Sequence, residues 1–211
     1  MLSEKNRTEV LRILKETYPD AKPALHFGTP FELLVATMLS AQCTDKQVNK
    51  CTDVLFPLYN TAEAFAALDF ETLEPYIKSC GVYRNKGRNI LAMSRILVEQ
   101  YHGEVPQTRE ELVKLPGVGR KTANLILGDV FHVPGSTVVD THCIRLSNRL
   151  GLVDHLKEPE KIERELRKIL PPEDSSDFCH CLVLHGRAVC DARKPRCEDC
   201  CLRHLCQSYS G

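Results

Sequence analysis

The stretch LPGVGRKTANLIL, residues 115–127, places a proline and two glycines directly before a helical pattern of apolar residues. Pro116 cannot continue a preceding helix, and glycine tolerates the positive φ of a tight turn. Upstream, Thr108 and Glu111 have the spacing of a capping box that starts a short helix. The stretch and its flanks therefore predict a helix, a hairpin and a second helix over about residues 108–131.

Apolar residues spaced three and four apart extend the helical pattern along the chain. They recur in three segments: Phe31, Leu34, Val35, Met38 and Leu39; Ala123, Ile126, Leu127, Val130 and Phe131; and Ile162, Leu166, Ile169 and Leu170. The best strand-like run, STVVD, is very short, and prolines and glycines separate the segments. We predict an all-α protein built from many short helices.

The composition indicates a folded protein with one large or two small domains. The chain has 211 residues, 43% of them hydrophobic, and no net charge. Its charged start, MLSEKNRTEV, lacks a signal-peptide core, and no apolar run reaches the roughly 20 residues of a membrane span. We therefore expect a soluble, cytoplasmic protein without a targeting segment or a membrane partner.

A nucleic-acid partner must be argued from local charge, because the net charge is zero. Residues 82–98 contain four basic side chains and no acidic one, although a solvated face explains such a strip equally well. The hairpin is more informative. Gly117, Val118 and Gly119 leave its backbone bare, with a helix N-terminus behind it, and such N–H groups can bind a DNA phosphate. An ordinary turn between two helices would need glycine too.

Arg120 and Lys121 lie at a helix start, where acidic residues are normally found. The positive helix end and Arg120 both disfavour a second positive charge, and a neutral lysine amine is a nucleophile that can form a Schiff base. An isolated lysine is otherwise a solvated surface residue. The pattern singles out Lys121 as a candidate nucleophile.

A candidate partner lies in STVVDTHCIRLSNRLGL, residues 136–152, where Asp140 precedes a helix expected at Thr141–Leu150. Aspartate is among the best N-cap residues. A preorganised carboxylate can also stabilise the positive charge that develops on a sugar as its base departs. The spacing alone does not choose between the two roles.

Four of the eleven cysteines, Cys190, Cys197, Cys200 and Cys206, form a C-x6-C-x2-C-x5-C array near the C-terminus. In a reducing compartment this array suits a [4Fe–4S] cluster or a structural zinc rather than disulfides. Zinc sites more often pair two C-x2-C knuckles and this array has one, so we favour the cluster. From spacing alone, Cys201 could replace Cys200. The scattered cysteines at 43, 51, 80, 143, 179 and 181 are expected to be core or surface thiols.

Three motifs in order, LPGVGRKTAN, VVDTHCIRLSNRLGL and the cysteine array, closely resemble the endonuclease III family of helix-hairpin-helix (HhH-GPD) glycosylases. LLVATMLSAQCTD and GVYRNKGRNI resemble that family as well. The resemblance implies two α-helical lobes with a DNA groove between them. One lobe is a six-helix bundle at residues 22–133; the other, the cluster domain, joins residues 1–21 to 134–211.

The resemblance also implies a base excision repair enzyme that removes oxidised pyrimidines from duplex DNA and cleaves abasic sites by β-elimination. Lys121 matches the family's nucleophilic lysine and Asp140 its essential carboxylate. The four cysteines of the array match the [4Fe–4S] ligands. We expect a monomeric, nucleoid-associated enzyme of bacterial type whose partner is double-stranded DNA with damaged pyrimidines or abasic sites.

Other matches point to DNA contacts, because such enzymes flip the target nucleotide out of the duplex. Gln42 and Val82 match the positions that wedge into the emptied duplex, although the family usually has leucine at the latter. Without the resemblance, Gln42 would read as a polar loop residue and Val82 as a buried contact. His142 matches a residue near the DNA. Lys194, in the basic ARKPR run, matches a phosphate-contacting loop, and the hairpin Gly117–Arg120 matches the phosphate clamp.

Two alternatives remain open. A sister glycosylase, specific for adenine opposite oxidised guanine, shares the hairpin, the aspartate and the cluster, but usually has serine at the position of Lys121. A non-catalytic DNA-binding module would use the hairpin only as a phosphate clamp. The presence of both Lys121 and Asp140 disfavours the second.

Overall fold

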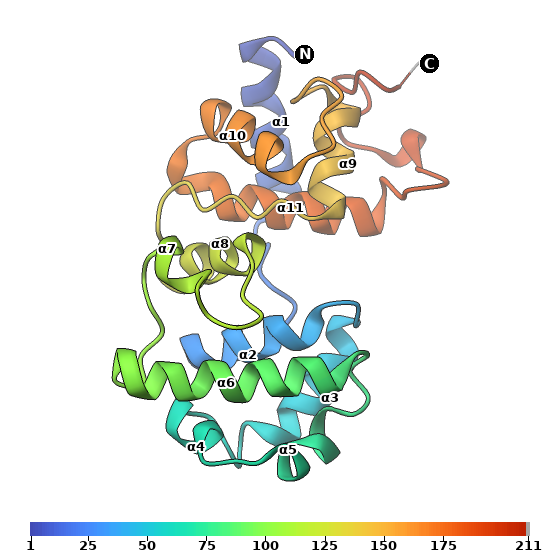
Figure 1. Cartoon of the computed structure of the whole chain (residues 1–211). Helices are drawn as coiled ribbons and strands as arrows, with labels where there is room; N and C mark the ends of the chain where they lie inside the picture. The colour runs from blue at the N-terminus through green and yellow to red at the C-terminus, as the bar shows by residue number, and fades with distance from the viewer. Residues whose placement is uncertain (210–211) are drawn as a thin grey trace. The chain divides into compact units, whose positions relative to one another are not determined.

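The structure, a computed structural model, describes residues 1–209, and no β-strand occurs among them (Figure 1). The all-α prediction is confirmed. The chain divides into two compact units. Unit 1 combines Met1–Pro23 with His132–Gly211, and unit 2 is the intervening Ala24–Phe131.

Unit 2 is built around one fully buried helix. Every residue of α2 from Phe31 to Leu39 is buried, which is typical of a helix in the centre of a core. Helices α3, α6 and α8 pack against it. The helices of the unit are α2 (Pro30–Ser40), α3 (Asp45–Leu55), α4 (Ala62–Ala66), α5 (Phe70–Ile77), α6 (Tyr83–Tyr101), α7 (Arg109–Leu112) and α8 (Arg120–Asp129). Both apolar faces predicted in this region lie in its core.

Most helices of unit 2 begin at a side-chain cap, and the sequence predicted the one at Thr108. The capping residues Thr29, Thr44, Thr61, Asp69 and Thr108 each accept a hydrogen bond from the backbone N–H three residues on. Helix α7 is shorter than the helix expected between Thr108 and Leu115. The chain directly after α7 forms tighter, 3-10-like turns, in which the N–H groups of Lys114 and Leu115 donate to the carbonyls three residues back. Helical geometry is disfavoured directly before a proline, here Pro116.

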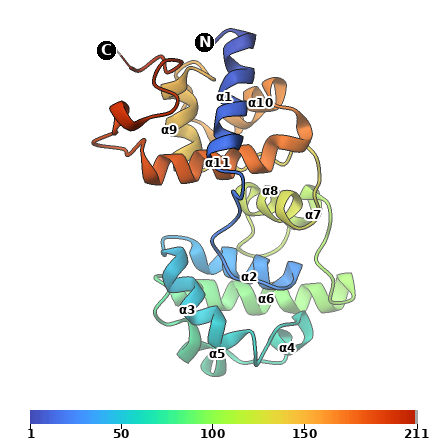
Figure 2. The same cartoon turned by 180° about the vertical axis from the view of Figure 1, so that it is seen from behind.

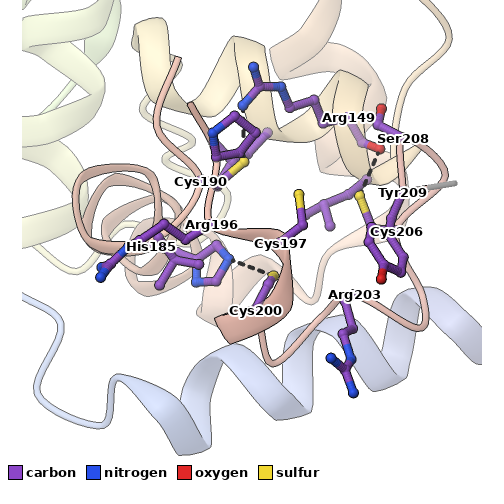
Figure 3. A pocket seen from close by; sticks show the side chains of 14 residues that line it. Arg149, His185, Cys190, Arg196, Cys197, Cys200, Arg203, Cys206, Ser208 and Tyr209 are labelled. Carbon is purple, nitrogen blue, oxygen red and sulfur yellow. Dashed lines mark hydrogen bonds between the residues drawn. The ribbon is translucent and has the colours of Figure 1, made fainter. Parts of the chain in front are cut away.

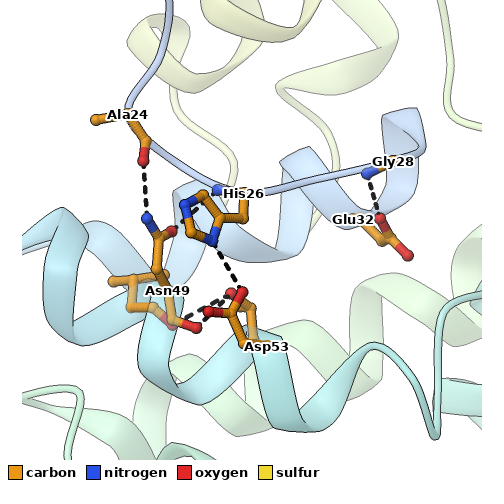
Figure 4. Close-up of polar contacts among 8 residues, drawn as sticks. Ala24, His26, Gly28, Glu32, Asn49 and Asp53 are labelled. Carbon is orange, nitrogen blue, oxygen red and sulfur yellow. Dashed lines mark hydrogen bonds and ion pairs between the residues drawn. The ribbon is translucent and has the colours of Figure 1, made fainter.

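A small polar network holds the segment that leads into α2 against α3 (Figure 4). The Asn49 side chain donates to the carbonyl of Ala24 at 2.8 Å and accepts from the N–H of His26 at 3.0 Å. His26 Nδ1 lies 2.9 Å from the carboxylate of Asp53. This network fixes where the buried helix begins.

Unit 1 brings the N-terminal helix together with the C-terminal part of the chain. Helix α1 packs beside α11, and α11 packs against α9 (Figures 1 and 2). The side chain of Lys15 also forms an ion pair with Asp174. The elements of the unit are α1 (Glu4–Thr17), α9 (Thr141–Leu150), α10 (Pro159–Ile169), α11 (Ser175–Ala188) and the 3-10 turns η1 (Pro172–Asp174) and η2 (Cys197–Asp199). In the described part of the chain, no helix has the length and apolar character that a membrane crossing requires.

Candidate functional site

The hairpin before α8 requires glycine at its first position, Gly117, because of its backbone conformation and its close packing. Gly117 has φ +78°, in the left-handed region that side chains rarely adopt. A Cβ atom there would lie 2.8 Å from Met38 Cε and 3.0 Å from Asn89 Cβ. Val118, 6% exposed, anchors the hairpin in the core of unit 2. Gly117 and Val118 therefore have structural roles in shaping this turn.

Gly119 differs, because nothing in the protein requires a glycine at this position. Its φ of −94° suits any residue, and a Cβ atom there would meet no atom within 4 Å. The glycine leaves the exposed backbone bare at the point where α8 begins. A bare backbone allows close approach of an external group to its N–H donors.

Helix α8 begins without the usual compensation for its dipole. Its N-cap, Gly119, offers no side-chain acceptor, and its first turn has no acidic residue. The first N–H groups of a helix lack intrahelical partners, so this end can bind an anion. Arg120 and Lys121 are both exposed on this turn. The hairpin, the helix end and Lys121 therefore form one continuous exposed surface of unit 2.

Two further loops of unit 2 present strained, exposed residues. Gln42 has φ 55° and Val82 has φ 57°, a conformation that is a genuine outlier for a β-branched residue. Val82 is 57% exposed, so its alternative interpretation as a buried contact is wrong. A Cβ atom on Gly81 would lie 3.5 Å from the carbonyl oxygen of Gln42, so the two turns are neighbours. Strain of this kind concentrates at functional sites.

Asp140 is the N-cap of α9, whose bounds agree with the predicted Thr141–Leu150. Its Oδ1 accepts the Cys143 N–H at 2.8 Å, which confirms the capping interpretation. The cap uses one carboxylate oxygen, and the side chain is half-buried rather than enclosed. Asp140 can therefore cap the helix and still present a charged oxygen to a ligand.

His142, the second residue of α9, lies half-buried against α11. Its Nδ1 is 3.1 Å from Arg145 Nη2, and a Cβ atom on Gly186 would lie only 2.5 Å from that nitrogen. Burial lowers the pKa of His142, while the charge of Asp140 opposes the shift. The imidazole is therefore neutral near pH 7 and acts as a hydrogen-bonding group rather than a cation.

The four cysteines of the array line one cavity of about 250 Å³ in unit 1 (Figure 3). This is far more than the roughly 10–15 Å³ of such volume that holds one water molecule. Cys201 does not line it; its Sγ lies 3.6 Å from the hydroxyl of Thr17 instead. The geometry thus distinguishes Cys200 from Cys201, which the spacing could not do.

Arg149 and His185 also line the cavity, and no sequence pattern indicated either residue. Arg149 Nη1 lies 3.2 Å from Cys190 Sγ, and His185 Nε2 lies 3.3 Å from Cys200 Sγ. The other nitrogen of His185 pairs with the hydroxyl of Tyr18 at 3.0 Å, and burial lowers the pKa of the ring. Both residues occupy ordinary helical positions on α9 and α11, so only the folded chain reveals their neighbours.

The sulfurs surround the cavity rather than a single point. Within residues 1–209, no three His, Cys, Asp or Glu side chains are arranged to hold one metal ion. Burial raises the pKa of Cys200 to about 11 and also raises that of Cys206. Both are neutral thiols on their own, and a bound cationic group would be needed to deprotonate them.

The basic loop after Cys190 is held by backbone contacts. Arg149 donates to the carbonyls of Asp191 and Ala192 at 2.7 and 2.8 Å. The Asp191 carboxylate accepts the N–H groups of Arg193 and Lys194, and these bonds lower its pKa. The Lys194 side chain is exposed on this loop.

Comparison with known proteins gives consistent similarities over the whole chain. Residues 35–172 match the HhH-GPD superfamily of base excision DNA repair proteins. Endonuclease III of Synechocystis sp. is 51% identical over 209 residues, covering 99% of this chain and 95% of that protein. Endonuclease III of Escherichia coli K12 is 46% identical over 206 residues, covering 98% and 97%. A solved structure of a trapped endonuclease III–DNA covalent intermediate is 45% identical with a TM-score of 0.92, covering 99% of this chain and 97% of that one.

Proposed function

The chain belongs to the endonuclease III family of HhH-GPD base excision DNA repair proteins, and we propose that Lys121 and Asp140 perform its reaction. The protein is a DNA glycosylase with AP lyase activity: it binds damaged double-stranded DNA, removes oxidised pyrimidines and cleaves the abasic strand. The observation that supports the role of Lys121 best is its exposed position on the first turn of α8, directly behind the bare backbone of Gly119.

In this proposal, the amine of Lys121 attacks C1′ of the damaged nucleoside and the base leaves with the bonding electrons. The sugar ring then opens to give a Schiff base on Lys121. Loss of a proton from C2′ drives β-elimination, which breaks the strand on the 3′ side. Water finally hydrolyses the Schiff base and restores the amine.

Asp140 provides negative charge as the base departs. Its Oδ1 is fixed by the Cys143 N–H, so the position of the carboxylate is set before the substrate arrives. A charge that is already oriented stabilises a developing positive sugar without reorganisation. The capping bond and the catalytic role therefore support each other.

DNA binding is assigned to exposed residues of both units. The N–H groups of the Gly117–Arg120 hairpin donate hydrogen bonds to a phosphate, and Gln42 and Val82 enter the space that the flipped nucleotide leaves. Lys194 contacts a second phosphate, and His142 donates or accepts a hydrogen bond as a neutral ring. We assign the bundle to residues 22–133 and the cluster domain to residues 1–21 and 134–211; the bundle expected to have six helices has seven when the four-residue α7 is counted. We expect the enzyme at the nucleoid, where its substrate is found.

The cavity lined by Cys190, Cys197, Cys200 and Cys206 is assigned to a [4Fe–4S] cluster. In such a cluster each iron takes one thiolate, so the four sulfurs surround a volume instead of converging on one ion. The arrangement of the array around its cavity supports this choice over zinc. When bound, the cluster cross-links the 190–206 loop and neutralises its thiolates. Arg149 and His185 contact two of the sulfurs and orient them.

The function is tested with three duplexes that contain thymine glycol, an abasic site, or adenine opposite 8-oxoguanine. We expect base release and strand nicking on the first and nicking on the second. Activity on the third alone would instead indicate the adenine-specific sister enzyme. Binding without any cleavage would indicate a non-catalytic module.

A further inference from the structure

A thiol pair lies in unit 2, far along the chain from the cysteine array. Cys51 belongs to α3, and Cys80 lies in the turn between α5 and α6. The Cys80 thiol donates to Cys51 Sγ across 3.6 Å. Neither residue has a role in the reaction described above, and both are reduced in this structure.

The surroundings of the two sulfurs are unequal. Cys51 Sγ lies 3.1 Å from the hydroxyl of Ser79 and 3.8 Å from the side-chain amide of Gln47. The same amide donates to Ser79 Oγ at 2.9 Å, so the three side chains form one polar cluster at Cys51. Cys80 is fully buried, and its burial together with Cys51 raises its pKa. Cys51 therefore has polar side-chain neighbours, one of them exposed, whereas Cys80 is enclosed and its thiol stays protonated.

We propose that Cys51 and Cys80 are a redox modification site, at which a peroxide forms a reversible disulfide between α3 and the turn before α6. Ser79 is exposed and touches Cys51, so a molecule as small as hydrogen peroxide needs to pass only one side chain. The Cys51–Cys80 pair thus combines a short sulfur–sulfur contact with polar neighbours that reach the protein surface.

The reaction balances in two steps. The Cys51 sulfur attacks one oxygen of hydrogen peroxide; an S–O bond forms, the O–O bond breaks, and the leaving hydroxide takes the proton of the Cys51 thiol and departs as water. The Cys80 sulfur then attacks the Cys51 sulfur; the S–S bond forms, the S–O bond breaks, and a second water leaves with the Cys80 proton. The two thiols lose two electrons and the peroxide gains them. A small thiol reverses the step by exchange.

The disulfide would affect the turn that carries Val82. The sulfurs must approach from 3.6 Å to about 2.05 Å, a movement of about 1.5 Å. Cys51 is fixed within α3 by its buried neighbours Val48 and Leu55, so the turn at Cys80 must move. Gly81 and Val82 follow Cys80 directly, and Gly81 packs against Gln42. This consequence rests on the proposed role of Gln42 and Val82 in DNA binding.

The test treats the full-length, cluster-loaded protein with hydrogen peroxide, blocks the remaining thiols, and maps disulfide-linked peptides by mass spectrometry. We expect a Cys51–Cys80 link that a reductant removes. The buried pair Cys143 and Cys179, 0% and 1% exposed, serves as an internal comparison and should stay reduced. Absence of the Cys51–Cys80 link, or a link of Cys80 to Cys43 in its place, would overturn the proposal.

Affinity for an abasic-site duplex provides the second measurement. After peroxide treatment, affinity should fall about tenfold in the wild type and recover on reduction, a change of about 1.4 kcal/mol. Cys51→Ser keeps all four cluster cysteines, so peroxide should leave its affinity unchanged; Cys43→Ser should respond like the wild type. An unchanged affinity in linked wild-type protein would refute the effect on the turn. Failure of the proposed function would look different, because the reduced protein itself would then not bind DNA.

Discussion

In the proposed mechanism, Asp140 combines a structural and a catalytic role, because a carboxylate has two oxygens. One oxygen caps α9 through the Cys143 N–H, and this bond also fixes the direction of the other. A residue with only the structural role is available for comparison: Asp69 caps α5 by accepting the Thr72 N–H at 2.9 Å. Comparing substitutions at the two aspartates therefore separates the contribution of a helix cap to stability from the contribution of a charge to the reaction.

Asp140→Asn should leave the fold intact and remove most of the base release. Asparagine is as good an N-cap as aspartate, so the free energy of unfolding should change by less than about 1 kcal/mol. Single-turnover release of thymine glycol should fall about a hundredfold or more, as when one preorganised electrostatic group is lost. Asp69→Asn, the matched control, should keep full activity. Equal activity of the two variants would refute the role of Asp140.

Residues differ in how far their sequence context predicts them. The bounds of α9 follow from local chemistry and were predicted, whereas the cap at Asp140 was one of two roles that the sequence left open. The positive φ of Val82 did not follow, since no local rule places a β-branched residue there. Arg149 and His185 were missed because their contacts with Cys190 and Cys200 join positions 41 and 15 residues apart. Contacts of that kind depend on packing rather than on sequence pattern.

At the scale of elements, the two hairpin glycines make different demands. Gly117 is required by the conformation and packing of the turn. Gly119 has open space around it, which leaves room for an external group at the start of α8. The sequence predicted the hairpin and the Thr108 cap, because both depend on neighbouring residues. The early end of α7 at Leu112 was not predicted, since the tightened turns before Pro116 carry no periodic signal.

Alanine at each glycine separates folding from DNA binding. Gly117→Ala should destabilise unit 2 by at least about 1 kcal/mol, because of its left-handed φ and the contact with Met38. Gly119→Ala should change the free energy of unfolding by less than about 0.5 kcal/mol. Its affinity for duplex DNA should nevertheless fall roughly tenfold, the effect of losing one hydrogen bond to a charged group. Denaturant unfolding and a binding titration measure both. Unchanged affinity in Gly119→Ala would argue against a phosphate at the hairpin.

The loop that follows Cys190 should make one phosphate contact through Lys194. Lys194→Ala should reduce the slope of log affinity against log salt by about one. Lys168→Ala is the control, because this lysine already pairs with Glu165 at 2.8 Å on α10. Titrations at several salt concentrations give the slopes. Identical slopes for the Lys194 variant and the wild type would contradict the contact.

The four-cysteine loop should bind iron through Cys197 and not through Cys201. Cys197→Ser should lose iron and sulfide, and weaken DNA binding, because the basic loop loses its anchor. Cys201→Ser should retain iron, sulfide and DNA binding, since Cys201 lies outside the cavity next to Thr17. Metal and sulfide analysis of anaerobically purified protein decides the matter. Stoichiometric zinc without iron would refute the cluster.

At the scale of the whole molecule, the two units contain different parts of the candidate site. Unit 2 presents the hairpin, Lys121 and the strained turns at Gln42 and Val82. Unit 1 presents Asp140, His142 and the cysteine-lined cavity. The helical character and the order of the motifs were predictable, because both are local in sequence. The joining of the N-terminal helix to the C-terminal part was implied only by the family resemblance, because no periodicity or cap signals contacts between the two ends of the chain.

The central claim is that Lys121 is the nucleophile, and reductive trapping tests it most directly. The enzyme is incubated with a thymine-glycol duplex and borohydride, and the adduct is digested and mapped. We predict a covalent protein–DNA adduct on Lys121 in the wild type. Lys121→Gln should form none and still bind DNA, because the hairpin backbone is unchanged. Undiminished trapping in Lys121→Gln, or an adduct that maps to another amine such as the N-terminus, would contradict the account.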